Sequence, residues 1–190
     1  VVTVTALGSG ARQSVGKKIE SLGSNFIIVF PEQSNAPGAH GAQGTGAHLT
    51  EDDGRAIRRE AVSIAAVAPV LRTRAQFVVS DKNVSTSVIG TNRDFFTVRT
   101  WGVRSGSMWD EHDEALKAKV CLLGETVRQN LFGDQDPVGR YVRVDRYSYR
   151  VIGVLESKGE APLGGDQDDV VLMPIGSMRA RLFRTPPGFA

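Results

Sequence analysis

The spacing of apolar residues at the start of the chain predicts a helix followed by a strand. Val15, Ile19 and Leu22 lie at i, i+4 and i+7, which predicts one stripe of an amphipathic helix. The continuous apolar run at 25–30 is closed by Pro31, which is typical of a buried strand. We therefore expect helix and strand to alternate here without an internal repeat.

A second helix is predicted after a glycine-rich loop. Residues 34–48 hold glycines among small or polar neighbours, which is typical of a flexible loop. Thr50 is a suitable N-cap, and the acidic residues at 51–53 suit the positive end of a helix dipole. This helix is expected to run to about Glu60.

Alternating apolar and polar positions predict two β-hairpins in the rest of the chain. The first joins 71–79 to 84–88 through a turn at 80–83, and the second joins 141–144 to 149–154 around 145–148. A helical turn is expected through Phe95 and Phe96, capped by Asn92 or Asp94. A buried strand is expected at 120–123, followed by a helix that has Thr126, Val127 and Leu131 on one face and ends at Gly133. The remaining expected elements are a turn at 134–137, a polar loop at 157–169, a strand at 170–173 and a short helix after Pro174. Because hairpins exclude a purely parallel sheet, the predicted fold class is α+β.

Length and charge narrow the function classes. The 190 residues are enough for a real core, and 23 Lys and Arg against 21 Asp and Glu leave a net charge of +2. The charges are mixed along the chain without an evident basic cluster, which argues against a dedicated nucleic-acid binder. The lone cysteine, Cys121, excludes an internal disulfide and a multi-cysteine metal site, and it leaves the compartment open.

The two ends of the sequence look like cuts from something longer. No apolar run reaches the roughly 18–20 residues that span a bilayer. Residues 1–7 are uncharged and have neither a Met start nor a basic region, so they do not form a signal peptide. They are either a strand or the outer end of a transmembrane helix, and the turn-like segment at 184–190 also reads as an excision.

One motif near the start imitates a dinucleotide-binding fingerprint. Gly8 and Gly10 follow an apolar run, and Glu32 lies beyond the next apolar strand. However, Gln13 occupies the place of the third glycine, and hairpins follow instead of further βαβ units. A glycine hinge before a helix is the favoured interpretation, and cofactor binding is kept as an alternative.

No other group of residues has the pattern of a catalytic or metal site. The histidines form neither an H-E-x-x-H motif nor an i, i+4 pair. Cys121 lies in an apolar strand, where a thiol is usually inert. No serine occurs in a G-x-S-x-G motif. The acidic groups do not have a calcium-loop pattern and are interpreted as turn and cap residues. The residues considered are His40, His48, His112, Cys121, Asp134, Asp136, Asp166, Asp168 and Asp169. We therefore predict no catalytic, cofactor-binding or metal-binding residues.

Ordered motifs along nearly the whole chain resemble the periplasmic core domain of MacB-type ABC transporter permeases. They are the segments at 6–11, 19–29, 68–70, 88–91, 131–139, 151–155 and 166–174. Each piece alone is weak, but the ordered set is specific. The motif Leu131-Phe132-Gly133-Asp134-Gln135-Asp136-Pro137-Val138-Gly139 carries much of the resemblance.

The resemblance implies a two-part domain between two transmembrane helices of a permease. A porter-like part would comprise residues 1–98 and 168–190, and a sabre-like inserted part would comprise 99–167. It implies no enzymatic activity and no cofactor in this domain, since ATP is hydrolysed by a separate cytoplasmic nucleotide-binding domain. Implied partners are that domain, a second permease, and in exporters a membrane-fusion adaptor and a TolC-like outer-membrane duct. The implied location is the periplasmic face of the bacterial inner membrane.

The sequence departs from the family pattern at its end and leaves several questions open. It stops near Leu182, where family members continue with a further strand–helix–strand stretch, so the porter-like part is expected to be incomplete. The expected role is transmission of conformational change for efflux or extraction of a substrate. The loops at 34–48 and 157–169 are plausible contact surfaces, but neither the contact residues nor the cargo follows from the sequence. A small-molecule or lipid-binding periplasmic module and a dinucleotide-binding enzyme fragment remain alternatives.

Overall fold

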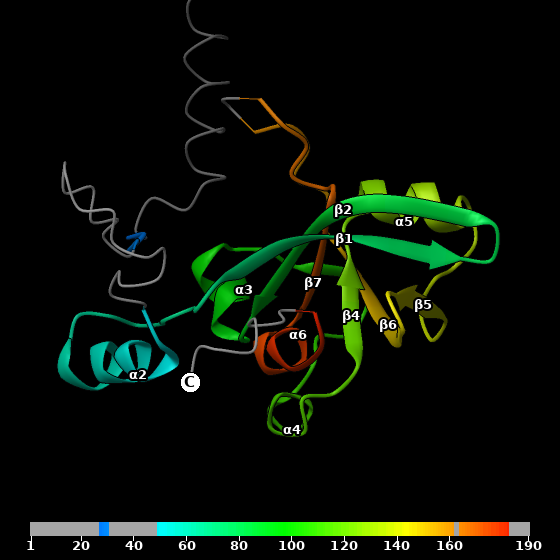
Figure 1. The fold of residues 1–190 in the computed structure, drawn as a ribbon. Helices are drawn as coiled ribbons and strands as arrows, with labels where there is room; N and C mark the ends of the chain where they lie inside the picture. Colours follow the sequence, from blue (N-terminus) through cyan, green and yellow to red (C-terminus); the bar gives the residue numbers. More distant parts are fainter. Residues whose placement is uncertain (1–26, 31–48, 162–163, 183–190) are drawn as a thin grey trace, which may run out of the picture.

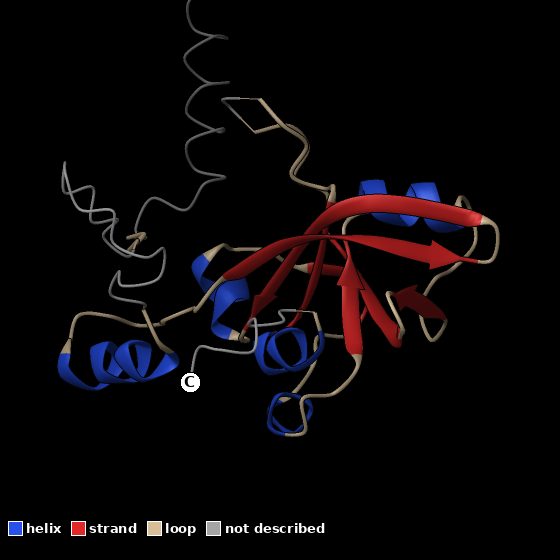
Figure 2. Ribbon diagram, in the orientation of Figure 1, coloured by secondary structure: helices blue, strands red, loops and turns tan. Residues whose placement is uncertain are grey.

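The computed structural model describes residues 27–30, 49–161 and 164–182. These residues form a mixed sheet with short helices around it (Figures 1 and 2). The helices are α2 (Glu51–Glu60), α3 (Asp94–Val98), α4 (Glu111–Ala115), α5 (Glu125–Phe132) and α6 (Ile175–Arg181). The strands are β1 (Leu71–Val79), β2 (Lys82–Thr91), β3 (Val103–Gly106), β4 (Val120–Leu123), β5 (Tyr141–Val144), β6 (Tyr147–Leu155) and β7 (Val170–Pro174).

Six of the strands are paired in a closed ring. The order is β1–β2–β7–β4–β6–β5, and β5 pairs again with β1. The β2–β7 and β4–β6 pairs are parallel and the other pairs in the ring are antiparallel. β3 lies outside the ring and pairs with the end of β6. The ring therefore leaves no unpaired edge among its own strands.

The strands separate two hydrophobic clusters. One side of every ring strand contributes to an inner cluster, which α5 and α6 complete with residues such as Leu131 and Met178. The opposite side of β2, β4, β6 and β7 contributes to an outer cluster with the aromatic side chains of α3 and the segment after it, among them Trp101 and Trp109. α5 lies above β2 and α6 lies below the strands in Figure 1. The sheet is therefore buried on both of its faces where these helices and the aromatic segment cover it.

A glycine allows α6 to approach the sheet closely. A Cβ atom on Gly90 of β2 would lie 2.5 Å from Met178 Sδ and 3.3 Å from Ile175 Cα. Any side chain at 90 would therefore push α6 away from β2. Met178 is fully buried in the inner cluster.

Most elements predicted from the sequence are confirmed. The Thr50 capping box and the helix to Glu60 are present, as are both hairpins, the buried strand β4, the helix α5 that ends at Gly133, the strand β7 and the last helix α6. Both hairpin turns are shorter than predicted, because pairing extends to Val79↔Lys82 and Val144↔Tyr147. The α+β class is confirmed.

Two local predictions differ from the structure, and two short elements had no prediction. Residues 27–30 form no strand and are exposed, with Ile27 86% and Phe30 78% accessible, because no described strand pairs with them. Arg93, rather than a polar capping side chain, occupies the N-cap of α3. β3 and α4 were not predicted, since the polar residues at 104–114 show neither period clearly. The predicted helix at 15–22 and the loop at 34–48 lie outside the described residues.

The division into a porter-like part (1–98 and 168–190) and a sabre-like part (99–167) remains a prediction. Strands from both sides of these boundaries share the same ring, since β7 pairs with β2 and β4, and β5 pairs with β1. Among the described residues, no helix is both long and apolar enough to cross a membrane.

Candidate functional site

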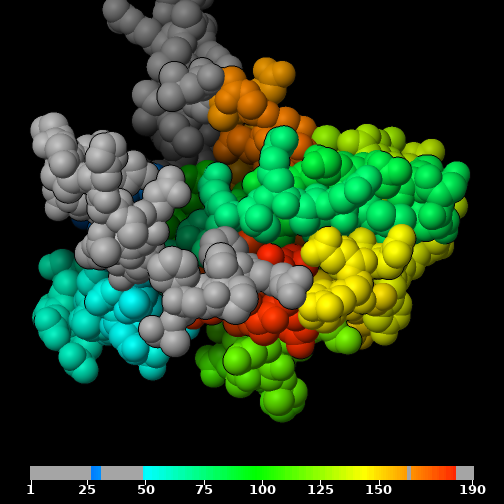
Figure 3. Space-filling view, in the orientation of Figure 1, coloured from blue at the N-terminus to red at the C-terminus, as the bar shows by residue number. Residues whose placement is uncertain are grey.

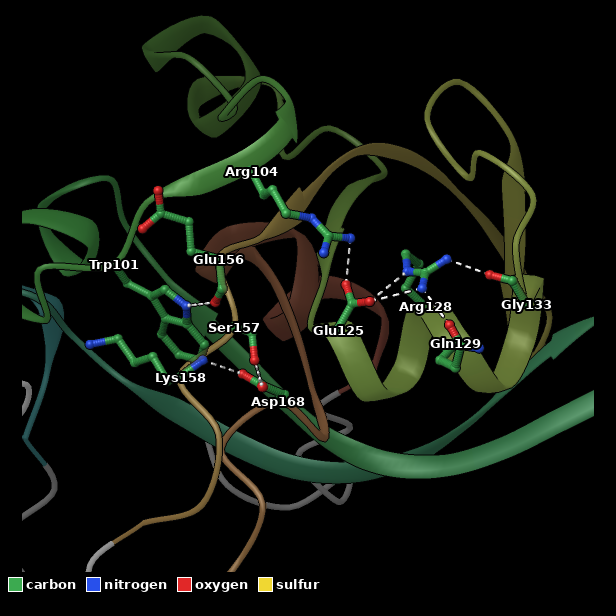
Figure 4. A network of polar contacts seen from close by, with 10 residues as sticks. All are labelled: Trp101, Arg104, Glu125, Arg128, Gln129, Gly133, Glu156, Ser157, Lys158 and Asp168. Carbon is green, nitrogen blue, oxygen red and sulfur yellow. Dashed lines mark hydrogen bonds and ion pairs between the residues drawn. The ribbon is translucent and has the colours of Figure 1, made fainter.

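The main polar cluster lies at the base of the loop between β6 and β7. Asp168 is only 4% exposed, and its carboxylate accepts hydrogen bonds from three consecutive residues. Figure 4 shows the bonds from Ser157 and Lys158. The donors are the Ser157 hydroxyl, the Lys158 backbone N–H at 2.8 Å and the Gly159 backbone N–H at 3.1 Å. We call these four residues the loop clamp. It ties the start of the loop to its end, so both sides of the loop leave the sheet together.

Neighbouring residues hold the loop clamp in place. Asp166 accepts a hydrogen bond from the Asp168 backbone N–H at 2.8 Å and another from the Thr126 hydroxyl of α5 at 2.5 Å. Gly124, the N-cap of α5, donates to the Val170 carbonyl at 2.8 Å, and a Cβ atom there would overlap the Asp168 carbonyl oxygen. The start of α5 therefore fits against the backbone of the loop only because residue 124 is a glycine.

Lys158 and Trp101 connect the loop clamp to the outer hydrophobic cluster. The Lys158 ammonium lies 5.5 Å from the centroid of the Trp101 ring and donates to the Arg99 carbonyl at 2.8 Å. The Trp101 indole N–H donates to the Glu156 carbonyl at 2.7 Å. Burial lowers the pKa of Lys158, and repulsion by Arg99 lowers it further. The contact between ammonium and ring is a cation–π interaction.

An ion-pair chain lies next to the loop clamp on α5. Glu125 in the first turn of α5 pairs with Arg104 at 2.6 Å and with Arg128 at 2.8 Å. Arg128 also donates to the carbonyl of Gly133, which ends the helix. The acidic residue lies at the positive end of the helix dipole and the arginine reaches the negative end, so both charges stabilise α5.

A cleft of about 310 Å³ lies beneath α2. Two ion pairs hold α2 over it, Arg58 with Asp94 at 2.7 Å and Glu51 with Arg179 at 2.9 Å. The lining residues are Glu51, Gly54, Arg55, Arg58, Val67, Pro69, Asn92, Glu114, Lys117, Pro174, Ile175 and Gly176. The volume is at the lower end for small-molecule sites, and the mixed charges differ from the apolar lining that such sites usually have.

The acidic residues singled out in the sequence act as turn and anchoring groups where the structure shows their bonds. Asp136 accepts a hydrogen bond from the Val138 N–H at 3.0 Å, and Asp166 and Asp168 hold the loop as described. In 27–30, 49–161 and 164–182, no three His, Cys, Asp or Glu residues are grouped to hold a metal ion. Asp136 and Asp166 thus accept hydrogen bonds within local turns, as the sequence suggested, whereas Asp168 is a buried anchor of the loop, which differs from the turn and cap interpretation.

The other candidate residues are not brought together. His112 is exposed on α4, and Cys121 is fully buried in β4, where burial strongly raises the pKa of its thiol. A thiol in that state is a poor nucleophile. Gly8, Gly10, Gln13, Glu32, His40 and His48 lie outside the described residues. The cofactor alternative at Gly8 and Gly10 is therefore untested by the geometry.

Sequence reasoning identified the loop at 157–169 but missed how it is anchored. In the sequence Asp168 resembles its neighbours Asp166 and Asp169, whereas in the structure it is buried and bonded to residues 157–159. The contact of Lys158 with Trp101 joins residues 57 positions apart (158 minus 101), which no local pattern reveals. Trp101 in a short apolar stretch after Phe95 and Phe96 was the one available signal of an aromatic cluster.

Comparisons with known proteins connect this fold to a family. A family model described as the MacB-like periplasmic core domain matches residues 1–188. A protein of Rhodospirillum rubrum called macrolide export ATP-binding/permease protein MacB is 40% identical over 185 residues, which are 96% of this chain and 28% of that protein. A protein of the same name from Chlorobaculum tepidum is 37% identical over 182 residues, again 96% of this chain and 28% of that protein. The chain thus spans little more than a quarter of the length of these relatives.

Two solved structures share the fold. The periplasmic region of MacB from Actinobacillus actinomycetemcomitans is similar with a TM-score of 0.63 and 21% identity, over 73% of this chain and 60% of that chain. The extracellular domain of the noncanonic ABC-type transporter YknZ from Gram-positive bacteria is similar with a TM-score of 0.62 and 17% identity, over 72% of this chain and 67% of that chain. At these identities the likeness concerns the fold alone.

Proposed function

The chain belongs to the family of MacB-like periplasmic core domains, and from this membership we propose that it transmits conformational change within an ABC transporter permease. The motion would originate in ATP hydrolysis by a separate nucleotide-binding domain and would drive efflux or extraction of a substrate. The observation that carries the proposal is the match across residues 1–188, together with relatives whose names combine ATP binding, permease and macrolide export.

The mechanical properties of the ring support a transmitting role. All six ring strands are hydrogen-bonded on both sides along part of their length, and helices α5 and α6 complete a tightly packed inner cluster. Packed interiors have low compressibility, so a displacement applied at one side of such a body reaches the other side. A domain that transmits motion needs this kind of stiffness.

The loop between β6 and β7 is the proposed contact for an adaptor protein. It extends away from the sheet in Figure 1, and the loop clamp fixes its base. A loop fixed in this way on a rigid scaffold presents its residues with little entropic cost on binding. We propose that a membrane-fusion adaptor, where one is present, contacts this loop, and that a permease homodimer carries two copies of it.

The chain itself is proposed to have no ATPase activity. The purified 190-residue chain should release no phosphate from ATP, whereas the full-length protein with its nucleotide-binding domain should. Phosphate release by the chain alone, at a rate that survives further purification, would contradict this.

A coupling experiment on the full-length permease tests the transmitting role. Gly90→Leu should push α6 off β2 and soften the ring, because a Cβ atom there already lies 2.5 Å from Met178 Sδ. In vesicles, we expect ATP hydrolysis to persist while export of a macrolide per ATP falls at least about fivefold. Ser105→Leu, at an exposed position on β3, is the control and should leave both rates unchanged. Equal export per ATP in both variants, with weakened packing confirmed by urea unfolding, would exclude a transmitting role for this body.

The small-molecule or lipid-binding module remains a second hypothesis, favoured by the cleft beneath α2. A ligand that binds only the folded state stabilises it in proportion to the logarithm of its excess over Kd. A thermal-shift screen of the chain with macrolides and lipids tests this: a saturable rise in Tm that Arg58→Ala and Glu114→Ala abolish would support a ligand site there.

A further inference from the structure

Four arginines lie on one outward face of the ring. Arg72 and Arg74 are on β1, Arg143 is on β5 and Arg150 is on β6, and all four are exposed. Residues adjacent to them in sequence, among them Ala75, Val144 and Tyr149, belong to or pack against the cluster that contains Phe77. We call these four residues the arginine face. Because β-strand side chains alternate, arginines two residues apart in sequence share a face.

The strand register places the arginines toward two ends of the arginine face. Arg72 and Arg74 lie opposite Ile89 and Ser87 of β2, and Arg143 lies beside Val78, four residues along β1 from Arg74. Val78 of β1 pairs with Arg143 of β5, which pairs in turn with Ser148 of β6. Arg150 pairs with Tyr141, whose exposed ring lies at the rim of the face. Figure 3 shows the green atoms of the β1–β2 hairpin adjoining the yellow atoms of the β5–β6 hairpin on one side of the molecule.

No carboxylate stands among these arginines on the described strands. The other outward positions are uncharged, namely Gln76, Val78, Asn83, Ser85, Ser87, Tyr141 and Ser148. Acidic residues come only at the two hairpin turns, at Asp81 and Asp145. Among the described residues, none of the four arginines forms an ion pair, in contrast with Arg55, Arg58 and Arg59 of α2.

Basic residues continue beyond one end of this face. Repulsion by Arg72 contributes, after burial, to lowering the pKa of Arg99, and Arg99 has the same effect on Lys158. These three residues are therefore close enough to influence one another electrostatically. Such a field of one sign attracts polyanions and raises their local concentration.

We propose that the arginine face binds the surface of an anionic lipid bilayer through the phosphate groups of its headgroups. Guanidinium groups match phosphate geometry with two parallel hydrogen bonds, and serine and glutamine between them offer further donors. An acidic protein partner fits less well, since protein interfaces depend on a buried centre with aromatic or apolar anchors. Here the apolar residues among the described outward positions are Val78, which is half-buried, and Tyr141, which lies at the rim. This inference goes beyond the proposed transport function and does not depend on it.

Vesicle binding of the 190-residue chain tests the proposal. The chain should co-sediment with phosphatidylcholine vesicles that contain about 30% phosphatidylglycerol and not with pure phosphatidylcholine, and each arginine should contribute about a fivefold change in partitioning. Arg74→Gln combined with Arg143→Gln should therefore weaken binding roughly 25-fold. Binding should also fall as salt rises from about 0.05 to 0.5 M, because the Debye length shrinks.

The matched control removes two arginines from a different place. Arg55→Gln with Arg59→Gln takes the same charge from α2, where both arginines are exposed and paired with acids, and should change binding less than about threefold. All three proteins are compared by circular dichroism to establish that they are folded. Equal losses in the two double variants, equal binding to neutral vesicles, or no vesicle binding would each overturn the proposal. Binding to polyglutamate without binding to anionic vesicles would also overturn it and assign the face to an acidic protein.

Discussion

Removing the carboxylate of the loop clamp should unfold the chain more easily. In Asp168→Ala, the Lys158 N–H, the Gly159 N–H and the Ser157 hydroxyl all lose their acceptor. The carboxylate is 4% exposed, so water cannot take its place without opening the base of the loop. The substitution therefore tests whether the loop is tied to the sheet.

The expected loss follows from the three accepted hydrogen bonds. A hydrogen bond to an ionised acceptor contributes about 1.5–3 kcal/mol, so the three give an upper range of roughly 4–9 kcal/mol. The donors are at the loop edge and regain part of this from water once the loop opens, and the cost of burying the carboxylate is also removed. We expect Asp168→Ala to lower the free energy of unfolding by about 3 kcal/mol and Asp168→Asn by about 1–2 kcal/mol, because the amide keeps one acceptor.

Urea unfolding and amide hydrogen exchange measure the effect together. The urea midpoint should fall with an unchanged m value, and the Lys158 and Gly159 amides should lose protection. Asp134→Asn removes the same charge from an exposed turn and should change stability by less than about 0.5 kcal/mol. If Asp168→Ala stays within about 0.5 kcal/mol of the unaltered chain, or if the two amides keep their protection, the reasoning about the loop clamp is wrong.

Three further perturbations have defined outcomes. Gly124→Ala should lower the free energy of unfolding by more than about 2 kcal/mol, because the new Cβ atom would overlap the Asp168 carbonyl oxygen. Urea unfolding measures this loss, and an unchanged midpoint would contradict the packing. Burial raises the pKa of the Cys121 thiol in the folded state, so the stability that the neutral thiol contributes is complete below the unfolded pKa of about 8.5. As pH rises above that value, the free energy of unfolding should fall by about 1.4 kcal/mol per pH unit relative to Cys121→Ala. Parallel curves of stability against pH for the two proteins would refute the burial. Reversing the charge of either Arg58 or Asp94 alone should speed amide hydrogen exchange in α2, whereas reversing both charges should restore protection in part. No difference between the single and double variants would mean that the pair does not hold α2.

The sequence predicted local elements well because their signals are local. The Thr50 capping box, the alternation at 71–79 and the glycine that ends α5 each act within a few residues of themselves. The buried strand expected at 25–30 is wrong for residues 27–30 because burial needs a partner, and the described part of the chain supplies none. Local pattern cannot distinguish an apolar run that is paired from one that is not.

The candidate sites depended on long-range arrangement and were less predictable. Asp168 differs from Asp166 only through where the ring places it. The mixed charges along the sequence gave an incomplete picture in the same way, since only the pairing of β5 with β1 puts Arg143 on the same outward side of the ring as Arg72 and Arg74. A strand spreads its charges between two faces, so a one-sided charge pattern becomes visible only in the folded sheet.

The position of β7 has a consequence for biosynthesis. β7 (Val170–Pro174) lies between β2 and β4, so the ring is open until its last strand has been made. About 80 residues separate the end of β2 from the end of β7, which is roughly 4–16 s of translation. During that interval β2 and β4 present bare edges that can pair with other nascent chains. The closed ring can therefore form only after synthesis has passed residue 174.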